Sequence, residues 1–178
     1  MNTVVVFTGL PGTGKSTLAD LTAKTLDAPA FAGDWLMGAL KPAAAALAQL
    51  DRNTYLQIYR GLLRSLITRQ LILEQSAIVD CVVTDDVLAE WRALAEHYRS
   101  ALYVIECICS DYTVHRRRVE GRVRGIPGWH EIDWDHVQRM RTEFGPLRAE
   151  RLTVDAMSPL ESNVESVLRY VGRTKANR

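Results

Sequence analysis

The sequence contains few cysteines, and those present follow no regular spacing. There are three, Cys81, Cys107 and Cys109. An odd number without a repeated spacing argues against a disulfide framework of the kind that small secreted domains use. No histidine or cysteine pair follows them at the spacing of a zinc site. We therefore expect these cysteines to be small residues of the hydrophobic core.

An excess of charge and long apolar runs are also lacking. The formal net charge is +1, so no overall field attracts the chain to nucleic acid or to an anionic membrane. The sequence has no run of about 18 apolar residues, which argues against a membrane span. The chain enters the apolar run Val4 to Phe7 without the basic segment and long apolar stretch of a signal peptide. We expect a cytoplasmic protein without a membrane partner.

The sequence does show a regular alternation of short apolar runs and longer helical patterns. Apolar residues make up 47 % of its 178 residues, enough for the core of one domain. We predict a single domain over 1–173 and a flexible tail over 174–178. Alternating strands and helices favour one parallel sheet between two helical layers, which is the three-layer α/β/α class. The predicted strands are Thr3–Thr8, 29–32, 76–81, 101–109 and 152–154; the predicted helices are Lys15–Leu26, 35–75 with two breaks, 84–99, 112–124, 133–143 and a last one from 158.

The most informative motif follows the first predicted strand. Residues 9–16 read Gly-Leu-Pro-Gly-Thr-Gly-Lys-Ser, which fits the phosphate-binding pattern G-x-x-x-x-G-K-S/T. Glycines let the backbone wrap around an anion, and the wrapped N–H groups and the following helix N-terminus attract phosphate. Lys15 is expected to reach the β- and γ-phosphates, and Ser16 to bind Mg²⁺. The predicted nucleotide-binding residues are Gly9, Leu10, Pro11, Gly12, Thr13, Gly14, Lys15, Ser16 and Thr17.

With this motif and element order, the chain resembles the small P-loop kinases related to adenylate kinase. These AAA-type ATP-binding proteins include gluconate kinase, chloramphenicol phosphotransferase and the kinase domain of polynucleotide kinase. The resemblance covers most of the chain and is specific at residues 9–16. It implies a five-stranded sheet of order 2-3-1-4-5, with ATP and Mg²⁺ as cofactors. It also implies a helical acceptor-binding insert over about 35–75 and an arginine-rich lid over about 112–134.

Two aspartates carry the resemblance further. Asp34 follows the second predicted strand, where similar hydroxyl kinases place a carboxylate that orients the acceptor hydroxyl and takes its proton. The alternative is an N-cap for a helix that starts at Trp35. Asp80 ends the third predicted strand and faces the ligand crevice of such a sheet, where it would hold a Mg²⁺-bound water or contact the acceptor. Its alternative is a plain turn residue.

An arginine-rich segment forms the third part of the resemblance. Residues 115–124 read His-Arg-Arg-Arg-Val-Glu-Gly-Arg-Val-Arg. On a continuous helix, Arg118 and Arg122 would share one face and could clamp the transferring phosphoryl group or stack on adenine. Five arginines beside one glutamate repel one another unless an anion lies among them. A solvated helix face is the alternative.

Other features bear on the acceptor and on the ends of helices. Arginines at 52, 60 and 64 in the insert would indicate an anionic acceptor if they point inward, and a neutral alcohol if they point outward. Trp129 and Trp134 lie in a predicted loop and either pack on the core or stack on a ligand ring. We expect Asp85 and Asp86 to cap the helix over 84–99, and residues 158–161 to form a capping box.

The leading hypothesis is an ATP-dependent kinase that phosphorylates a hydroxyl of a small-molecule or nucleoside-like acceptor. Lys15, Asp34, Arg118 and Arg122 are its predicted catalytic residues, and Ser16 and Asp80 its predicted metal-binding residues. A nucleoside monophosphate kinase and a polynucleotide 5′-hydroxyl kinase are the alternatives within the same class, the nucleic-acid end being less favoured. A non-catalytic ATP-binding switch or partner-dependent ATPase is the alternative from another class. The sequence leaves open the acceptor, the choice of ATP or GTP, and the oligomeric state.

Overall fold

The fold is built on a parallel sheet. The computed structural model describes residues 2–172, and within them five strands pair in the order β2-β3-β1-β4-β5. All the pairs are parallel, and Val5 of the central strand lies opposite Ile78 on one side and Tyr103 on the other. The predicted sheet order and fold class are therefore confirmed. The strands are β1 (Thr3–Thr8), β2 (Ala30–Ala32), β3 (Ala77–Asp80), β4 (Ala101–Ile108) and β5 (Leu152–Asp155).

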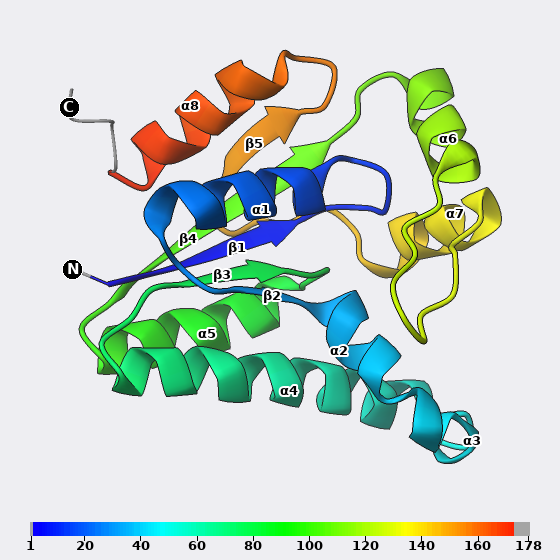
Figure 1. Ribbon diagram of the computed structural model, residues 1–178, viewed down its shortest axis with the longest axis horizontal. Helices are drawn as coiled ribbons and strands as arrows, with labels where there is room; N and C mark the ends of the chain where they lie inside the picture. Colours follow the sequence, from blue (N-terminus) through cyan, green and yellow to red (C-terminus); the bar gives the residue numbers. More distant parts are fainter. Residues whose placement is uncertain (1, 173–178) are drawn as a thin grey trace.

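Helices cover both faces of this sheet, and others lie beyond its carboxyl end. In Figure 1, α1 (Lys15–Leu26) and α8 (Leu160–Tyr170) lie above the sheet, and α4 (Arg52–Ile72) and α5 (Asp85–His97) below it. The strand arrows point toward the side of the molecule that holds the remaining helical elements. Ligands of open parallel sheets bind at this carboxyl end. These elements are α2 (Gly33–Ala39), η1 (Lys41–Ala43), α3 (Ala44–Leu47), α6 (Tyr112–Gly121) and α7 (Trp134–Glu143).

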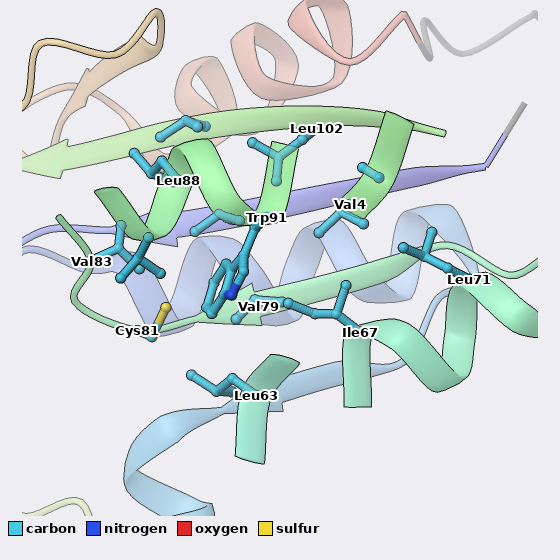
Figure 2. Close-up of a cluster of buried hydrophobic side chains, with 14 residues drawn as sticks. Val4, Leu63, Ile67, Leu71, Val79, Cys81, Val83, Leu88, Trp91 and Leu102 are labelled. Carbon is cyan, nitrogen blue, oxygen red and sulfur yellow. The ribbon is translucent and has the colours of Figure 1, made fainter. Parts of the chain in front are cut away.

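The central strand β1 is buried on both of its faces. Successive side chains of a strand point to opposite sides, and Val4 and Val6 pack with α4 and α5 while Val5 and Phe7 pack with α1 and α8. All four side chains are fully buried. Figure 2 shows the first of these two cores, where Trp91 of α5 lies among Leu63, Ile67 and Val79. The apolar run 3–8 thus contributes side chains to the hydrophobic cores on both faces of the sheet.

Three local predictions of the sequence were wrong. Helix α6 ends at Gly121 and not at 124, because glycine is a poor helix former and Arg122 has extended backbone angles (φ −91°, ψ 144°). Helix α8 has Pro159 as its N-cap and no side-chain cap hydrogen bond, so the capping box does not form. Neither Asp85 nor Asp86 caps α5, whose N-cap is Thr84; the carboxylate of Asp85 instead accepts hydrogen bonds from the backbone N–H groups of Arg148 and Ala149.

Two further expectations concern the termini and the membrane. The predicted flexible tail, 174–178, lies outside the described residues. Within residues 2–172, every helix is either too short or too polar to cross a bilayer.

Candidate functional site

The loop between β1 and α1 has the backbone angles that a phosphate-binding loop requires. Gly9, Gly12 and Gly14 all have positive φ, at 134°, 88° and 80°. A Cβ at residue 9 would lie 2.1 Å from the carbonyl oxygen of Cys107, so only glycine lets the loop run this close to β4. Helix α1 begins directly after Gly14, at Lys15. Its free N–H groups and positive dipole end therefore lie where the loop closes.

A buried histidine supports this loop from outside. Nε2 of His115, on α6, lies 2.8 Å from the carbonyl oxygen of Pro11. The ring also packs against Gly12, where an added Cβ would approach it to 3.2 Å. Burial lowers the pKa of His115, partly offset by the hydrogen bond to Pro11. A neutral imidazole with its proton on Nε2 fits this contact, and α6 thereby fixes the loop's outer side.

Lys15 and Asp80 meet at the inner side of the loop. The Nζ atom of Lys15 lies 3.9 Å from Oδ1 of Asp80, and both side chains are almost buried. Burial raises the pKa of Asp80, while Lys15 and a hydrogen bond from Ser16 act against this rise. At 3.9 Å the ion pair is too long for a hydrogen bond. Oδ1 of Asp80 thus has no hydrogen-bond partner within the described part of the chain. A buried carboxylate oxygen beside a serine hydroxyl fits the ligand preference of Mg²⁺.

Asp34 lies in the first turn of α2, at the carboxyl end of β2. The helix begins at Gly33 with Ala32 as its N-cap, and no side-chain cap forms. The alternative that Asp34 is an N-cap is therefore excluded. Its Oδ2 accepts a hydrogen bond of 2.5 Å from Nη2 of Arg124, and both side chains are mostly buried.

The two predicted lid arginines lie in different places. Arg118 donates from Nη2 to the carbonyl oxygen of Ala156 at 3.2 Å, which joins α6 to the segment after β5. Arg122 follows the end of α6, so the prediction that it shares a helix face with Arg118 was wrong. Among the described residues, Nε and Nη2 of Arg122 are buried without a hydrogen-bond partner. Burial and the neighbouring Arg124 lower the pKa of Arg122, while the charges of Asp34 and Asp80 act against this.

Comparison with known proteins agrees with this geometry. A family profile described as an AAA domain matches residues 4–147, from β1 to the segment before β5. The chain belongs to this AAA-domain family. A search of the curated proteins found no match.

Several solved structures similar to this AAA domain are described as kinases. A gluconokinase from Sinorhizobium meliloti 1021 is 18 % identical, with a TM-score of 0.69 over 97 % of this chain and 92 % of that one. A sugar kinase from Janibacter sp. HTCC2649 is 16 % identical, with a TM-score of 0.69 over 99 % and 97 %. An APS kinase from Mycobacterium tuberculosis, bound to AMPPNP and APS, is 16 % identical, with a TM-score of 0.63 over 96 % and 98 %. The fold of this AAA domain is therefore that of the small P-loop kinases.

A cavity of about 200 Å³ opens next to Lys15, Asp34 and Asp80 of the AAA domain. Much of its remaining wall is aromatic and comes from α4, α7 with its C-cap, and the segment between α6 and α7, while Pro11, Cys81 and Val82 complete it. The hydroxyl of Tyr59 lies over Gly33, where a Cβ would approach it to 2.0 Å. Loss of contact with water raises the pKa of Tyr59 well above its usual value, so this phenol stays protonated. The wall residues are Tyr55, Leu56, Tyr59, Trp129, His130, Ile132, His136, Met140 and Phe144.

The structure places both tryptophans and two of the three insert arginines, Arg52 and Arg64. Trp134 is buried and contacts Tyr112 and His115 edge to face, whereas Trp129 lines the cavity. Arg64 points away from the cavity and pairs with Glu90 of α5 at 2.6 Å. Arg52 borders the cavity but is held by Glu143 through two hydrogen bonds of 2.9 and 3.0 Å.

Sequence reasoning missed two residues of the site. Arg124 was part of the arginine-rich segment, but nothing in the local pattern distinguishes it from Arg116 or Arg117. A helix end predicted at Gly121 would have indicated that Arg122 and Arg124 do not continue the helix face of Arg118. Tyr59 packs against the first core, and its hydroxyl lies beside Gly33, the neighbour of Asp34; no local pattern in the sequence singles it out.

Proposed function

We propose that this protein is a kinase that transfers the γ-phosphoryl group of ATP to a hydroxyl group of a small molecule. The observation that carries the proposal is one cavity bordered at once by Lys15 of the phosphate-binding loop and by the carboxylate of Asp34. A polyphosphate held by the loop would end where an acceptor hydroxyl could contact Asp34. Membership of the AAA-domain family and the kinase fold support this assignment.

In the proposed complex, the loop glycines and α1 bind the β- and γ-phosphates. Lys15 contributes a positive charge to the phosphate-binding loop. Because its side chain is nearly buried, its attraction for phosphate is stronger than it would be in water. The Ser16 hydroxyl and Asp80 would hold Mg²⁺. When bound there, the ion would neutralise charge on the phosphate oxygens. Phosphoryl transfer depends mainly on placement and charge stabilisation, which these groups supply.

Asp34 is the proposed base for the acceptor. As the acceptor oxygen forms its bond to the γ-phosphorus and the bond to the ADP oxygen breaks, the hydroxyl proton passes to the Asp34 carboxylate. In the described structure Oδ2 is bound by Arg124, and Oδ1 has no hydrogen-bond partner among the described residues. Oδ1 is therefore the oxygen that could accept the acceptor hydroxyl. A base within hydrogen-bond reach accelerates such transfers by about 10²- to 10⁴-fold.

Arg122 is the proposed partner for the charge of the transferring group. Its guanidinium nitrogens Nε and Nη2 are buried and unbonded in the described structure, and an unpaired buried donor is costly. An anion beside Asp34 and Asp80 would remove that cost. Arg118, bound to the segment after β5, would instead lie on the nucleotide-base side. We keep both as proposed catalytic residues, with these separate roles.

The direct test is acceptor-dependent ADP formation. Purified protein with Mg·ATP is incubated with sugars, nucleosides, aromatic alcohols, antibiotics and 5′-hydroxyl oligonucleotides. A kinase forms ADP in proportion to one class of acceptor, with the phosphorylated acceptor found by mass spectrometry. ADP formation that ignores every acceptor in a folded sample that binds Mg·ATP would contradict the proposal and favour a switch or an ATPase.

A further inference from the structure

The part of the cavity beyond Asp34 is shaped for an apolar ring. Tyr55 and Tyr59 of α4 form one wall, and Trp129 and Phe144 from either side of α7 form others, with Met140 between them in sequence. Aromatic and thioether groups contact a ring through stacked or edge-on arrangements. A cavity of about 150 Å³ can enclose benzene, so the 200 Å³ present here has room for one ring, and a second cavity adjoins it at Arg52, Tyr55, Trp129 and His130.

The charges that border this cavity are already paired. Lys15 lies against Asp80, and Asp34 is held by Arg124. The remaining charged side chain at the wall, Arg52, has both its Nε and Nη2 atoms bound by the carboxylate of Glu143 on α7. Of the arginine and lysine side chains that line the cavity among the described residues, Lys15 is assigned to the nucleotide phosphates, and Arg52 has two of its three guanidinium nitrogens bound by Glu143.

Of the other basic groups nearby, Lys41 and His130 border an adjoining cavity that shares Arg52, Tyr55 and Trp129 with this one. Arg64 faces α5 and pairs with Glu90. Burial, together with the charge of Arg139, lowers the pKa of His136, which therefore stays neutral at and above neutral pH. Arg122 does not line the cavity, and it lies close enough to Asp34 and Asp80 for their charges to act on its pKa. Within the cavity itself, an anionic acceptor would compete with Glu143 for Arg52.

We infer that the acceptor is an uncharged alcohol carried on an apolar or aromatic ring, and that the Arg52–Glu143 pair disfavours anionic acceptors. This inference rests on the proposed function, because it names the substrate class of the same site. In this chain the arginine at the cavity rim is neutralised by a carboxylate of its own.

The test uses three probes that differ in one property at a time. They are 4-(hydroxymethyl)benzamide, 4-(hydroxymethyl)benzoate, which is its charged counterpart of equal size, and erythritol, which has hydroxyls but no ring. Binding to the protein with Mg·ADP is measured by saturation-transfer NMR at pH 8, where ordinary imidazoles are neutral. The expected result is a dissociation constant for the amide at least about tenfold below that of the carboxylate, and no measurable binding of erythritol.

Variants separate the role of the ion pair from a general effect of charge. Glu143→Gln frees Arg52 and should lower the dissociation constant of the carboxylate toward that of the amide. Glu90→Gln is the matched control, because it frees Arg64 on the far side of α4 and should change neither constant. Tighter binding of the carboxylate or of erythritol by the native protein, failure of all three probes to bind, or an equal response of both variants would overturn the inference.

The two proposals fail in different ways. Selective binding of the amide without phosphoryl transfer from ATP to any alcohol would contradict the proposed kinase activity and leave the binding preference in place. Transfer to a carboxylated or phosphorylated alcohol in preference to a neutral one would uphold the kinase and overturn the acceptor class.

Discussion

Arg124 and Asp34 are joined by a hydrogen bond of 2.5 Å between Nη2 and Oδ2, although they lie 90 positions apart in the chain. The bond connects the segment after α6 to the first turn of α2. The same segment is closed on itself, because the carboxylate of Glu131 accepts hydrogen bonds from the backbone N–H groups of Arg124 and Gly125. Asp34 therefore connects the end of β2 to the segment between α6 and α7, which borders the cavity.

Replacing Arg124 should loosen that segment. A hydrogen bond to a charged group contributes about 1.5–3 kcal/mol, so we expect Arg124→Gln to increase amide hydrogen exchange over residues 122–133 by roughly 10- to 100-fold. The acceptor KM should rise more than kcat falls, because Asp34 itself remains. Arg117→Gln, an exposed change on α6, is the control. Unchanged exchange in Arg124→Gln would show that the bond does not hold the segment.

Removing the proposed base should separate catalysis from nucleotide binding. We expect Asp34→Asn to lower kcat by about 10²- to 10⁴-fold, because the amide cannot take the hydroxyl proton. The dissociation constant of Mg·ATP, measured by calorimetry, should stay the same. Asp86→Asn changes an exposed aspartate of α5 and should leave both quantities unaltered. Near-normal turnover by Asp34→Asn would instead favour a phosphate acceptor, as in a nucleoside monophosphate kinase.

The loop lysine should dominate the affinity for triphosphate. Loss of its charge-assisted hydrogen bonds predicts that Lys15→Met weakens Mg·ATP binding by about 10- to 100-fold. Lys24→Met, an exposed lysine at the other end of α1, provides the comparison. Calorimetric titration gives both values, with circular dichroism to show that each variant is folded. Equal affinities for the two variants would contradict a phosphate cradle at residues 9–16.

His115 makes the stability of the fold depend on pH. Because burial lowers the pKa of this imidazole below its usual 6.5, the unfolded chain binds its proton more readily than the folded one. The free energy of unfolding should then fall as the pH is lowered through 6.5, and be unaffected by this residue well above that value. His136, whose pKa is lowered as well, adds to the same trend.

The contribution of His115 can be isolated by comparing slopes. Urea unfolding between pH 5 and 8 should show a smaller fall in stability at acid pH for His115→Gln than for the native protein. His97→Gln, at an exposed position of α5, should keep the native slope. An unchanged slope in His115→Gln would mean that this imidazole is not held neutral against Pro11.

The sequence predicted those parts of the fold that depend on local patterns. The bounds of β1 and α1 are confirmed because an apolar run, a glycine loop and a helical period lie next to one another along the chain. Asp34 and Asp80 were placed at the carboxyl ends of neighbouring strands, and β2 and β3 do lie side by side with Ala32 opposite Asp80. In a parallel sheet the carboxyl ends of neighbouring strands lie at the same edge, so two residues far apart in the sequence come close together.

What the sequence could not give were contacts without a local pattern. The pairing of Arg124 with Asp34 depends on where α6 ends and how the next segment folds back, and the predicted helix ran through that end. The neutralisation of Arg52 by Glu143 joins residues 91 positions apart. Neither has a spacing that a pattern could reveal, and both decide the charge of the cavity.

Tracing the γ-phosphoryl group itself tests the central claim most directly. ATP with ¹⁸O in its γ-phosphoryl oxygens is incubated with the protein, Mg²⁺ and the acceptors that promote ADP formation, and the products are analysed by mass spectrometry. The account predicts that a hydroxyl of the acceptor gains the labelled phosphoryl group, and that Asp34→Asn forms this product far more slowly while still binding Mg·ATP. The account would be contradicted if the label appeared solely in inorganic phosphate, at a rate that changed neither with the acceptor nor with the Asp34→Asn substitution.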